Sequence, residues 1–446
     1  MTRLVWVVLL SLPLSAEFRA GVARVRITPP LPAWLSGYAA RSKPAETVSL
    51  DLWAKALALD DGNGERFVVV TADLLGFTRE ITDEIAARVQ KKHGLARRQV
   101  VFNASHTHSG PLIWPRLTVA ASTGDDVDRW ARAYADALTG KLENLIGEAL
   151  GAVQPARAEF AIGTAGFAIN RRVEPLARIR PGESFPAPTD HSVPVLRVRG
   201  HDGRVLAIVF GYACHNTTLT AQFLEVSGDY AGYAQAALER TYPGTTALFV
   251  ELCGADQNPN PRSRRDLPEQ HGEALAAAVT AALDGKPRRI EGRLRSAWEL
   301  IELPFQSHMA NVYQAEAKSA DPFFAKRGRL MLEAFDAGRP VRSTAYPVQA
   351  FRIGEGPAWI ALGGEVVIDY QAQLKREYGS DRVVVLGYSN VVMGYIPSRR
   401  VQREGGYEAG DSMVYFLQPG WFTEEVEDLV LGSARRVLST IGFRAR

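Results

Sequence analysis

The stretch from residue 99 to residue 111 reads QVVFNASHTHSGP, and the chemistry-bearing part of the chain is organised around it. Residues 99–104 are mostly apolar and predict a buried strand, while the closing Gly-Pro pair ends regular structure. Two imidazoles two residues apart at the end of a strand, those of His106 and His108, are expected to point to the same side, because strand side chains alternate. The pair is therefore a candidate metal site, although two solvated histidines on a surface turn would give the same pattern.

Apolar runs and amphipathic periods alternate on both sides of this stretch. Residues 66–73 predict a buried strand, and residues 78–93 predict a helix in which apolar positions recur every three or four residues. Further strands are expected over residues 18–27, 193–198, 205–213, 246–252, 292–303, 344–353, 359–362 and 383–386. Further helices are expected over residues 125–150, 229–242, 269–283, 311–337 and 423–438, with another ending at 378. The pattern predicts an α/β (mixed α+β) fold in which helices flank mixed β-sheets, as one large catalytic domain over residues 17–446.

The charge balance excludes one class of partner. The 446 residues include 52 Lys or Arg and 49 Asp or Glu, which leaves a net charge of +3. A chain this close to neutral has no basic surface for nucleic acid, so we expect no nucleic-acid partner. The 46% hydrophobic and 23% charged content is that of an ordinary globular protein.

Residues 1–16 resemble an export signal. Arg3 supplies the positive end, residues 4–14 are apolar, and Ser15-Ala16 offers a small-residue cleavage site. The apolar run is too short to span a bilayer as a helix, and no later run is long enough either. We expect an exported protein, periplasmic or secreted, while an uncleaved membrane anchor is the alternative.

The chain has two cysteines, Cys214 and Cys253, and each ends an apolar run. In an oxidising compartment they could form a disulfide. Two buried free thiols are equally consistent with the sequence, because free cysteine is commonly buried. The sequence leaves both alternatives open.

Three more polar residues follow predicted strands at points where a site could form. His215 comes just after the strand ending at residue 213, Glu365 follows an apolar strand through two glycines, and Tyr395 lies in Gly-Tyr-Ile-Pro. The ends of strands in α/β sheets are where ligand sites form. Each residue alone would also fit an ordinary structural role. His215 could be a buried core histidine, Glu365 could complement the dipole at the start of a helix, and Tyr395 could simply pack in the core.

His106, His215 and Glu365 together have the residue types of a catalytic zinc site. Such a site uses about three nitrogen or oxygen ligands and keeps a position open for water. Zinc lowers the pKa of bound water to about 7, which makes hydroxide available at neutral pH. The loop 253–260, rich in Gly, Asp, Asn and Pro, also follows a strand and is expected either to be a simple turn or to place polar groups over the metal.

Six motifs, in the same order along the chain, resemble those of the neutral/alkaline ceramidase family. They are SHTHSGP (105–111), NRR (170–172), GDYAGYA (228–234), GADQNPN (254–260), GGE (363–365) and SNVVMGY (389–395). The resemblance runs from about residue 19 to about residue 410. It implies the fold and the single zinc ion of that family.

The resemblance also assigns residues. It implies that zinc is held by His106, His215, Glu365 and Tyr395. Members of the family cleave the amide of N-acylsphingosine to a fatty acid and sphingosine, which implies attack by zinc-activated water on a carbonyl carbon.

Two further residues receive roles by the same resemblance. His108 would be a proton shuttle or an oxyanion donor, and Arg171 would orient the substrate or hold the oxyanion.

The chain departs from the family pattern in three places. Asn258 stands where the family has a serine, and it could still donate a hydrogen bond to an oxyanion. The motif at residue 111 continues Leu112-Ile113-Trp114 instead of with a pair of glycines, so the rim of the pocket should differ. No C-terminal immunoglobulin-like domain is expected after the last helix.

The expected partner is a small lipid or amide substrate, with transient contact to a membrane surface. A different amide or ester substrate is the first alternative, and a catalytically silent zinc-binding protein is the second. A zinc-free serine hydrolase is disfavoured because the chain lacks a Gly-x-Ser-x-Gly motif. The oligomeric state is left open.

Overall fold

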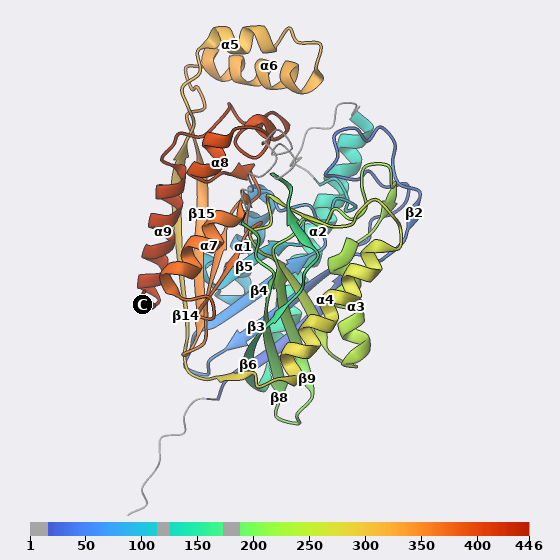
Figure 1. The fold of residues 1–446 in the computed structure, drawn as a ribbon, viewed down its shortest axis with the longest axis vertical. Helices are drawn as coiled ribbons and strands as arrows, with labels where there is room; N and C mark the ends of the chain where they lie inside the picture. The colour runs from blue at the N-terminus through green and yellow to red at the C-terminus, as the bar shows by residue number, and fades with distance from the viewer. Residues whose placement is uncertain (1–16, 114–124, 173–187, 446) are drawn as a thin grey trace, which may run out of the picture.

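Two β-sheets pack face to face, and helices cover both outer faces (Figure 1). The computed structural model describes residues 17–113, 125–172 and 188–445, so the predicted signal peptide, residues 1–16, lies outside the described residues. Trp114, named above as part of the pocket rim, also lies outside them. The mixed α/β architecture predicted from the sequence is confirmed.

The larger sheet has nine strands in the order β11-β9-β8-β6-β1-β3-β4-β5, with β13 paired to β6. The strands are β1 (Arg19–Arg26), β3 (Trp53–Asp60), β4 (Arg66–Ala72), β5 (Val100–Ala104), β6 (Gln154–Thr164), β8 (Ser192–Gly200), β9 (Val205–Tyr212), β11 (Thr246–Glu251) and β13 (Arg288–Ile290). The pairs β4–β5 and β9–β11 are parallel. The predicted hairpin between β8 and β9 is confirmed as an antiparallel pair.

The sequence did not predict β3 or β6. The sequence of β3, WAKALALD, is rich in alanine, leucine and lysine, which are common in helices and poor indicators of strand. Its pairing with β1 and β4 on either side overrides that local preference.

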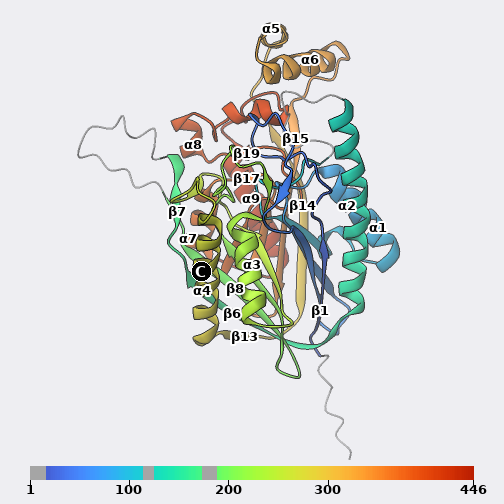
Figure 2. The ribbon, with the colours of Figure 1, turned by 90° about the vertical axis from the view of Figure 1, so that its right-hand side faces the viewer.

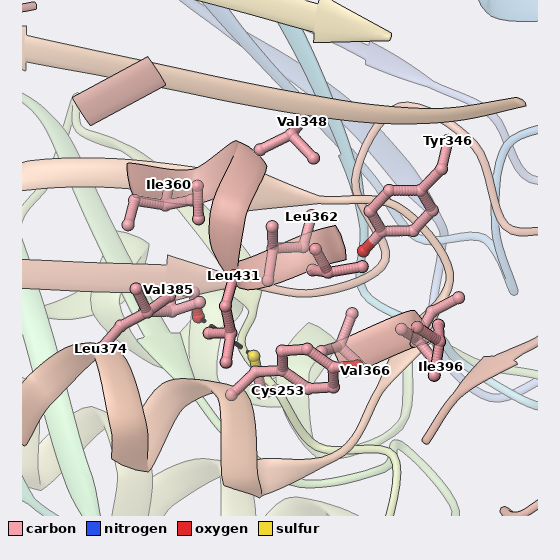
Figure 3. Close-up of a cluster of buried hydrophobic side chains, with 14 of the residues drawn as sticks. Cys253, Tyr346, Val348, Ile360, Leu362, Val366, Leu374, Val385, Ile396 and Leu431 are labelled. Atoms are coloured by element: carbon pink, nitrogen blue, oxygen red, sulfur yellow. Dashed lines mark hydrogen bonds between the residues drawn. The ribbon is translucent and has the colours of Figure 1, made fainter. Parts of the chain in front are cut away.

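The smaller sheet has the order β14-β15-β16-β18. Its strands are β14 (Leu294–Pro304), β15 (Ser343–Ile353), β16 (Ala358–Leu362) and β18 (Val383–Leu386). Alternate residues of these strands serve two different cores. Trp359 and Ala361 pack toward Leu248 and Val250 of the larger sheet. Ile360, Leu362 and Val385 instead join the outer cluster that Figure 3 shows under the helices.

Helices close the two outer faces. The larger sheet is covered by α1 (Arg79–His93), α2 (Asp125–Gly151), α3 (Asp229–Thr241) and α4 (Leu267–Asp284), and the smaller sheet by α7 (Ile368–Tyr378) and α9 (Val426–Thr440). Figure 1 shows this order of layers, from α9 on the left to α3 and α4 on the right. No helix in the described ranges is both long and apolar enough to cross a membrane.

Helix α1 illustrates how the sequence sets element ends. Thr78 caps its N-terminus by accepting a hydrogen bond from the Ile81 N–H, and Gly94 ends it in the left-handed conformation at φ +68°. The predicted boundaries, 78–93, are confirmed to within one residue.

Three pairs of short strands hold the loops together above the sheet ends. They are β2 (Thr47–Val48) with β10 (Glu225–Val226), β7 (Ala168–Asn170) with β12 (Gln257–Pro259), and β17 (Glu365–Val366) with β19 (Tyr395–Ile396). The prediction that Glu365 begins a helix is wrong, because the helix starts three residues later at Ile368. Glu365 instead pairs in parallel with Tyr395.

A helical hairpin projects beyond the body between β14 and β15 (Figures 1 and 2). The single helical segment predicted over 311–337 is two helices, α5 (Ala310–Glu316) and α6 (Pro322–Asp336). Asp321 caps α6 and Pro322 occupies its first turn, which is why a second helix starts there.

Both cysteines are free and buried. Cys253 lies in the outer core of the smaller sheet (Figure 3), where its Sγ is 3.9 Å from the carbonyl oxygen of Val385. The sequence left a disulfide open, and the structure places the two thiols apart as separate core side chains.

Candidate metal centre

The His106–His108 pair meets through a turn and not through strand alternation. Strand β5 ends at Ala104, and His106 takes a left-handed backbone conformation with φ +60°. The prediction that strand alternation brings the two imidazoles to the same side is therefore wrong in its geometry. The two Nε2 atoms nevertheless lie 3.1 Å apart. A non-glycine residue with positive φ is strained, and such strain commonly marks functional sites.

The ring of His106 is fixed by a main-chain group. Its Nδ1 lies 2.6 Å from the carbonyl oxygen of Leu75. Because a carbonyl only accepts hydrogen bonds, Nδ1 carries a proton and donates a hydrogen bond to Leu75, and Nε2 faces Glu365.

His215 is held in the same way, three residues after the end of β9. Its Nδ1 donates to the carbonyl oxygen of Gly254 over 2.8 Å, and its main-chain N–H donates to Gln257. Burial, reinforced by the nearby Arg171 guanidinium, lowers the pKa of His215 to about 4. The imidazole is therefore neutral at physiological pH, and its Nε2 lone pair is free.

Glu365 completes the inner cluster. Its Oε2 lies 3.2 Å from Nε2 of His106 and 3.3 Å from Nε2 of His215, and the residue is buried. Burial alone would raise the pKa of Glu365, but the two adjacent imidazoles outweigh it and hold the pKa well below its usual range. The site thus contains an ionised carboxylate facing two imidazole nitrogens.

Tyr395 and Arg171 adjoin this cluster. The Tyr395 hydroxyl lies 3.4 Å from Nε2 of His215, and it accepts a hydrogen bond of 2.9 Å from Nη2 of Arg171. Burial raises the pKa of Tyr395 well above its usual value, although Arg171 opposes the shift. The other side of the guanidinium donates from Nε to Oε1 of Glu408 over 2.6 Å. Glu408 therefore orients Arg171 toward the tyrosine hydroxyl.

His108 lies at the edge of the cluster under a covering loop. The Tyr38 ring is 4.8 Å from the His108 ring, and the Arg41 guanidinium donates to the main-chain carbonyl of His108. Gly37 has φ +95°, and a Cβ there would lie 2.6 Å from the His108 ring, so only glycine allows this approach. Burial, with a further effect of His106, lowers the pKa of His108 well below its usual value and keeps the ring neutral.

These residues fit a divalent metal ion such as zinc. The candidate ligand atoms of His106, His108 and His215 all lie within 4.8 Å of one another. Glu365 Oε2 is buried without a hydrogen-bond partner among the described residues, as expected of an atom that awaits a ligand. Two imidazoles whose Nδ1–H groups donate to carbonyl oxygens, together with a buried carboxylate, are the donor set that zinc takes.

A family model described as neutral/alkaline non-lysosomal ceramidase, N-terminal, matches residues 18–251. The chain belongs to the neutral/alkaline non-lysosomal ceramidase family. The matched segment contains β5, β9 and both histidines of the inner cluster, which agrees with the resemblance inferred from the sequence motifs.

Named ceramidases resemble the chain over different lengths. The neutral ceramidase of Pseudomonas aeruginosa is 21% identical over 478 residues, which cover 91% of this chain and 71% of that protein. The neutral ceramidase of Drosophila pseudoobscura is 23% identical over 267 residues, which are 55% of this chain but only 36% of that protein. The matched segments therefore cover between 36% and 71% of the length of these two relatives.

The fold of solved ceramidases is the same. The crystal structure of the Pseudomonas aeruginosa neutral ceramidase superposes with a TM-score of 0.75 at 18% identity, covering 97% of this chain and 76% of that one. A structure titled ceramidase complexed with C2 superposes with a TM-score of 0.74 at 18% identity. At this identity the likeness shows the ceramidase fold.

Asn258, at the family's serine position, is the predicted site residue that stands apart. It lies in β12 opposite Ile169, and its Oδ1 is 3.5 Å from the Thr217 hydroxyl. The main-chain carbonyl of its neighbour Gln257 accepts a hydrogen bond from the His215 N–H, so Asn258 borders the candidate metal centre without joining the cluster of imidazoles.

One residue that the sequence analysis did not single out ties the site together. The buried side chain of Asn216 donates to the Ser105 carbonyl oxygen and, over 3.2 Å, to Oε2 of Glu251, while its oxygen accepts from the Ala231 N–H. It thereby joins the segments that carry His106 and His215 to the start of α3. Its only signal in the sequence is its place beside His215.

Proposed function

We propose that the chain is a zinc-dependent amidohydrolase that cleaves the amide of an N-acylsphingosine. One observation carries the proposal: Nε2 of His106 and Nε2 of His215 both face Oε2 of Glu365 at 3.2 and 3.3 Å. The zinc ion supplies Lewis acidity, which polarises an amide carbonyl and brings the pKa of water to about 7. His106, His215 and Glu365 would hold it, with the Tyr395 hydroxyl as a fourth oxygen ligand.

The other residues act on the substrate and on protons. Arg171, fixed by Glu408 and directed at the Tyr395 hydroxyl, would hold the carbonyl oxygen as negative charge develops on it. His108 is neutral and has a buried Nδ1 with no partner among the described residues. It would accept a proton from the attacking water and give it to the leaving amine nitrogen, so that a C–O bond forms while the C–N bond breaks.

The substrate partner is proposed to be a membrane lipid reached by transient contact of the hairpin α5–α6 with an anionic phospholipid surface. Five of the exposed large apolar side chains of the described residues lie in or beside this hairpin: Met309, Val312, Phe324, Leu330 and Val341. Residues 309–342 contain six Lys or Arg and four Asp or Glu. Exposed apolar side chains beside an excess of positive charge suit such a surface.

The hairpin is also connected to the metal centre by aromatic side chains. The Phe323 ring of α6 lies 5.0 Å from the Tyr415 ring, Tyr415 lies 6.2 Å from Tyr407, and Tyr407 lies 5.4 Å from Tyr395. A lipid surface touching the hairpin would therefore be next to the face on which the candidate site lies.

The proposed location is outside the cytoplasm, in the periplasm or the medium. The basic residue followed by an apolar run in residues 1–16 supports it. Sequencing the N-terminus of the exported protein tests it, and a mature form that begins at Glu17 is expected.

The deciding experiment is fatty-acid release from labelled ceramide by zinc-loaded protein, with a chelator-stripped sample as control and bound zinc measured by mass spectrometry. Release that requires zinc is the expected result and would show that a serine at position 258 is dispensable. Tightly bound zinc without release would redirect the proposal to a different amide or ester. Protein that binds no zinc at all would contradict it.

A further inference from the structure

Tyr388 lies inside the candidate site, although no motif in the sequence marked it. It follows β18 by two residues, is fully buried, and has φ +47°, which is strained for a side chain of this size. Its N–H donates to the Gly364 carbonyl oxygen over 2.9 Å, and its own carbonyl accepts from the Ala104 N–H over 3.3 Å. The strained residue thus ties the segment that carries Glu365 to the strand that leads to His106.

The ring of Tyr388 packs on the imidazoles. Its centroid lies 4.3 Å from the His106 ring and 6.1 Å from the His215 ring. Its hydroxyl is buried and has no hydrogen-bond partner among the described residues. A buried hydroxyl without a partner destabilises a fold, so its persistence beside a ligand-binding cluster indicates that a ligand supplies the partner.

A second buried tyrosine, Tyr346, has a hydroxyl that is unpaired among the described residues and lies in apolar surroundings, and it serves as a comparison. Tyr346 is also fully buried with an unpartnered hydroxyl, but its ring points into the apolar cluster around Leu362 and Val366 (Figure 3). Burial raises the pKa of both phenols. At Tyr388 the largest further contribution comes from the charge of Glu365, whereas at Tyr346 it comes from Cys253. Only Tyr388 has the charged and ring-nitrogen groups of the site around it.

We propose that the Tyr388 hydroxyl donates a hydrogen bond to the acyl oxygen of the bound ligand: the carbonyl oxygen of the substrate or a carboxylate oxygen of the fatty-acid product. The inference rests on the proposed function for the nature of the ligand. It adds a second donor beside Arg171 for the same oxygen. A neutral phenol can donate in this way without changing its protonation state.

The test compares Tyr388→Phe with Tyr346→Phe, because both changes remove one buried, unpaired hydroxyl and keep the ring. Both variants should melt at or slightly above the wild-type temperature without ligand, since each loses an unsatisfied polar atom. Both variants and wild type should each bind one zinc ion. Affinity for octanoate, measured by calorimetry on zinc-loaded protein, should fall roughly tenfold in Tyr388→Phe alone. The kcat for ceramide should fall with it.

Equal octanoate affinity in wild type and Tyr388→Phe would overturn the inference, as would a wild-type protein that binds no octanoate. Loss of zinc from Tyr388→Phe would also overturn it, in favour of a purely structural role. A selective loss of octanoate affinity without any ceramide hydrolysis by wild type would uphold the hydroxyl as a ligand donor and contradict ceramide as the substrate.

Discussion

The candidate metal centre and the α5–α6 hairpin are assembled in opposite ways. The centre brings together His106, His215 and Glu365, which are far apart in sequence and almost fully buried. The hairpin is a single segment between two neighbouring strands, and several of its apolar side chains face solvent. The centre therefore depends on the whole fold for its geometry, whereas the hairpin is formed by one continuous segment.

The largest expected effect is loss of an inner ligand. His106→Ala should release the metal and lower hydrolysis by roughly 10³-fold or more, because removing even one stabilising group from an active site commonly costs about 10²–10³. Bound zinc and ceramide cleavage are the measurements. His201→Ala is the matched control, since that imidazole is half exposed and pairs with Glu17 at the surface. Full zinc content in His106→Ala would refute the ligand assignment.

Loss of an ion pair outside the centre should lower the free energy of unfolding instead of the rate of hydrolysis. Lys375 and Asp190, 185 residues apart, form an ion pair of 2.5 Å. Burial raises the pKa of Asp190, but Lys375 outweighs it and lowers the pKa to about 2. A carboxylate with a depressed pKa stabilises the fold at pH values above its unfolded pKa and loses that contribution as the pH falls toward 2.

Asp190→Asn should therefore lower the free energy of unfolding by about 2 kcal/mol at pH 7. This value follows from the lowering of the Asp190 pKa from 3.8 to about 2, at about 1.4 kcal/mol for each pKa unit. At pH 3 the difference from wild type should be about half as large. Urea unfolding at both pH values measures it, with zinc content as a check that the centre stays intact. A difference that does not shrink with falling pH would contradict the assigned cause.

Changes in the hairpin should weaken binding to membranes and leave the rate of hydrolysis unchanged. Phe324→Ser combined with Leu330→Ser removes two exposed apolar side chains of α6. At roughly 1 kcal/mol or less for each side chain withdrawn from a lipid surface, binding to phosphatidylglycerol-containing vesicles should weaken by about tenfold. Sedimentation with vesicles measures the binding.

Turnover of a short-chain, detergent-free ceramide provides the control for that variant, and it should be unchanged. Unaltered vesicle binding would remove the hairpin from the proposed contact. Dissociation of an oligomer in the double variant, seen by ultracentrifugation, would indicate that the apolar face covers a second copy of the chain instead.

The smallest effect is expected at Asn258, which borders the centre without contacting its imidazoles. Asn258→Ser introduces the serine that the motif resemblance places at this position. We expect zinc content to be unchanged and the rate to change by about twofold at most, as for sites that share no direct contact. A large gain in ceramide cleavage would show instead that this scaffold uses the serine.

Sequence reasoning located the centre because its residues follow apolar strands and fall in recognisable motifs. It did not give the geometry: the histidines meet through the left-handed conformation of His106, and Glu365 lies in a short strand. Asn216, Tyr388 and Glu408 were missed because their importance lies in contacts with residues that the chain brings close only on folding, such as Glu408 with Arg171 across 237 positions. Strands β3 and β6 were missed because their local composition does not favour strands.

The face-to-face arrangement of the two sheets has a consequence for how ligand binding should be transmitted. His106 and His215 follow strands of the nine-stranded sheet, and Glu365 follows a strand of the four-stranded sheet. An ion held by all three residues would connect the two sheets, and separating the sheets would require its release. Metal binding should therefore slow amide hydrogen exchange in the buried layer between the sheets, around Val250 and Trp359, well away from the ion itself.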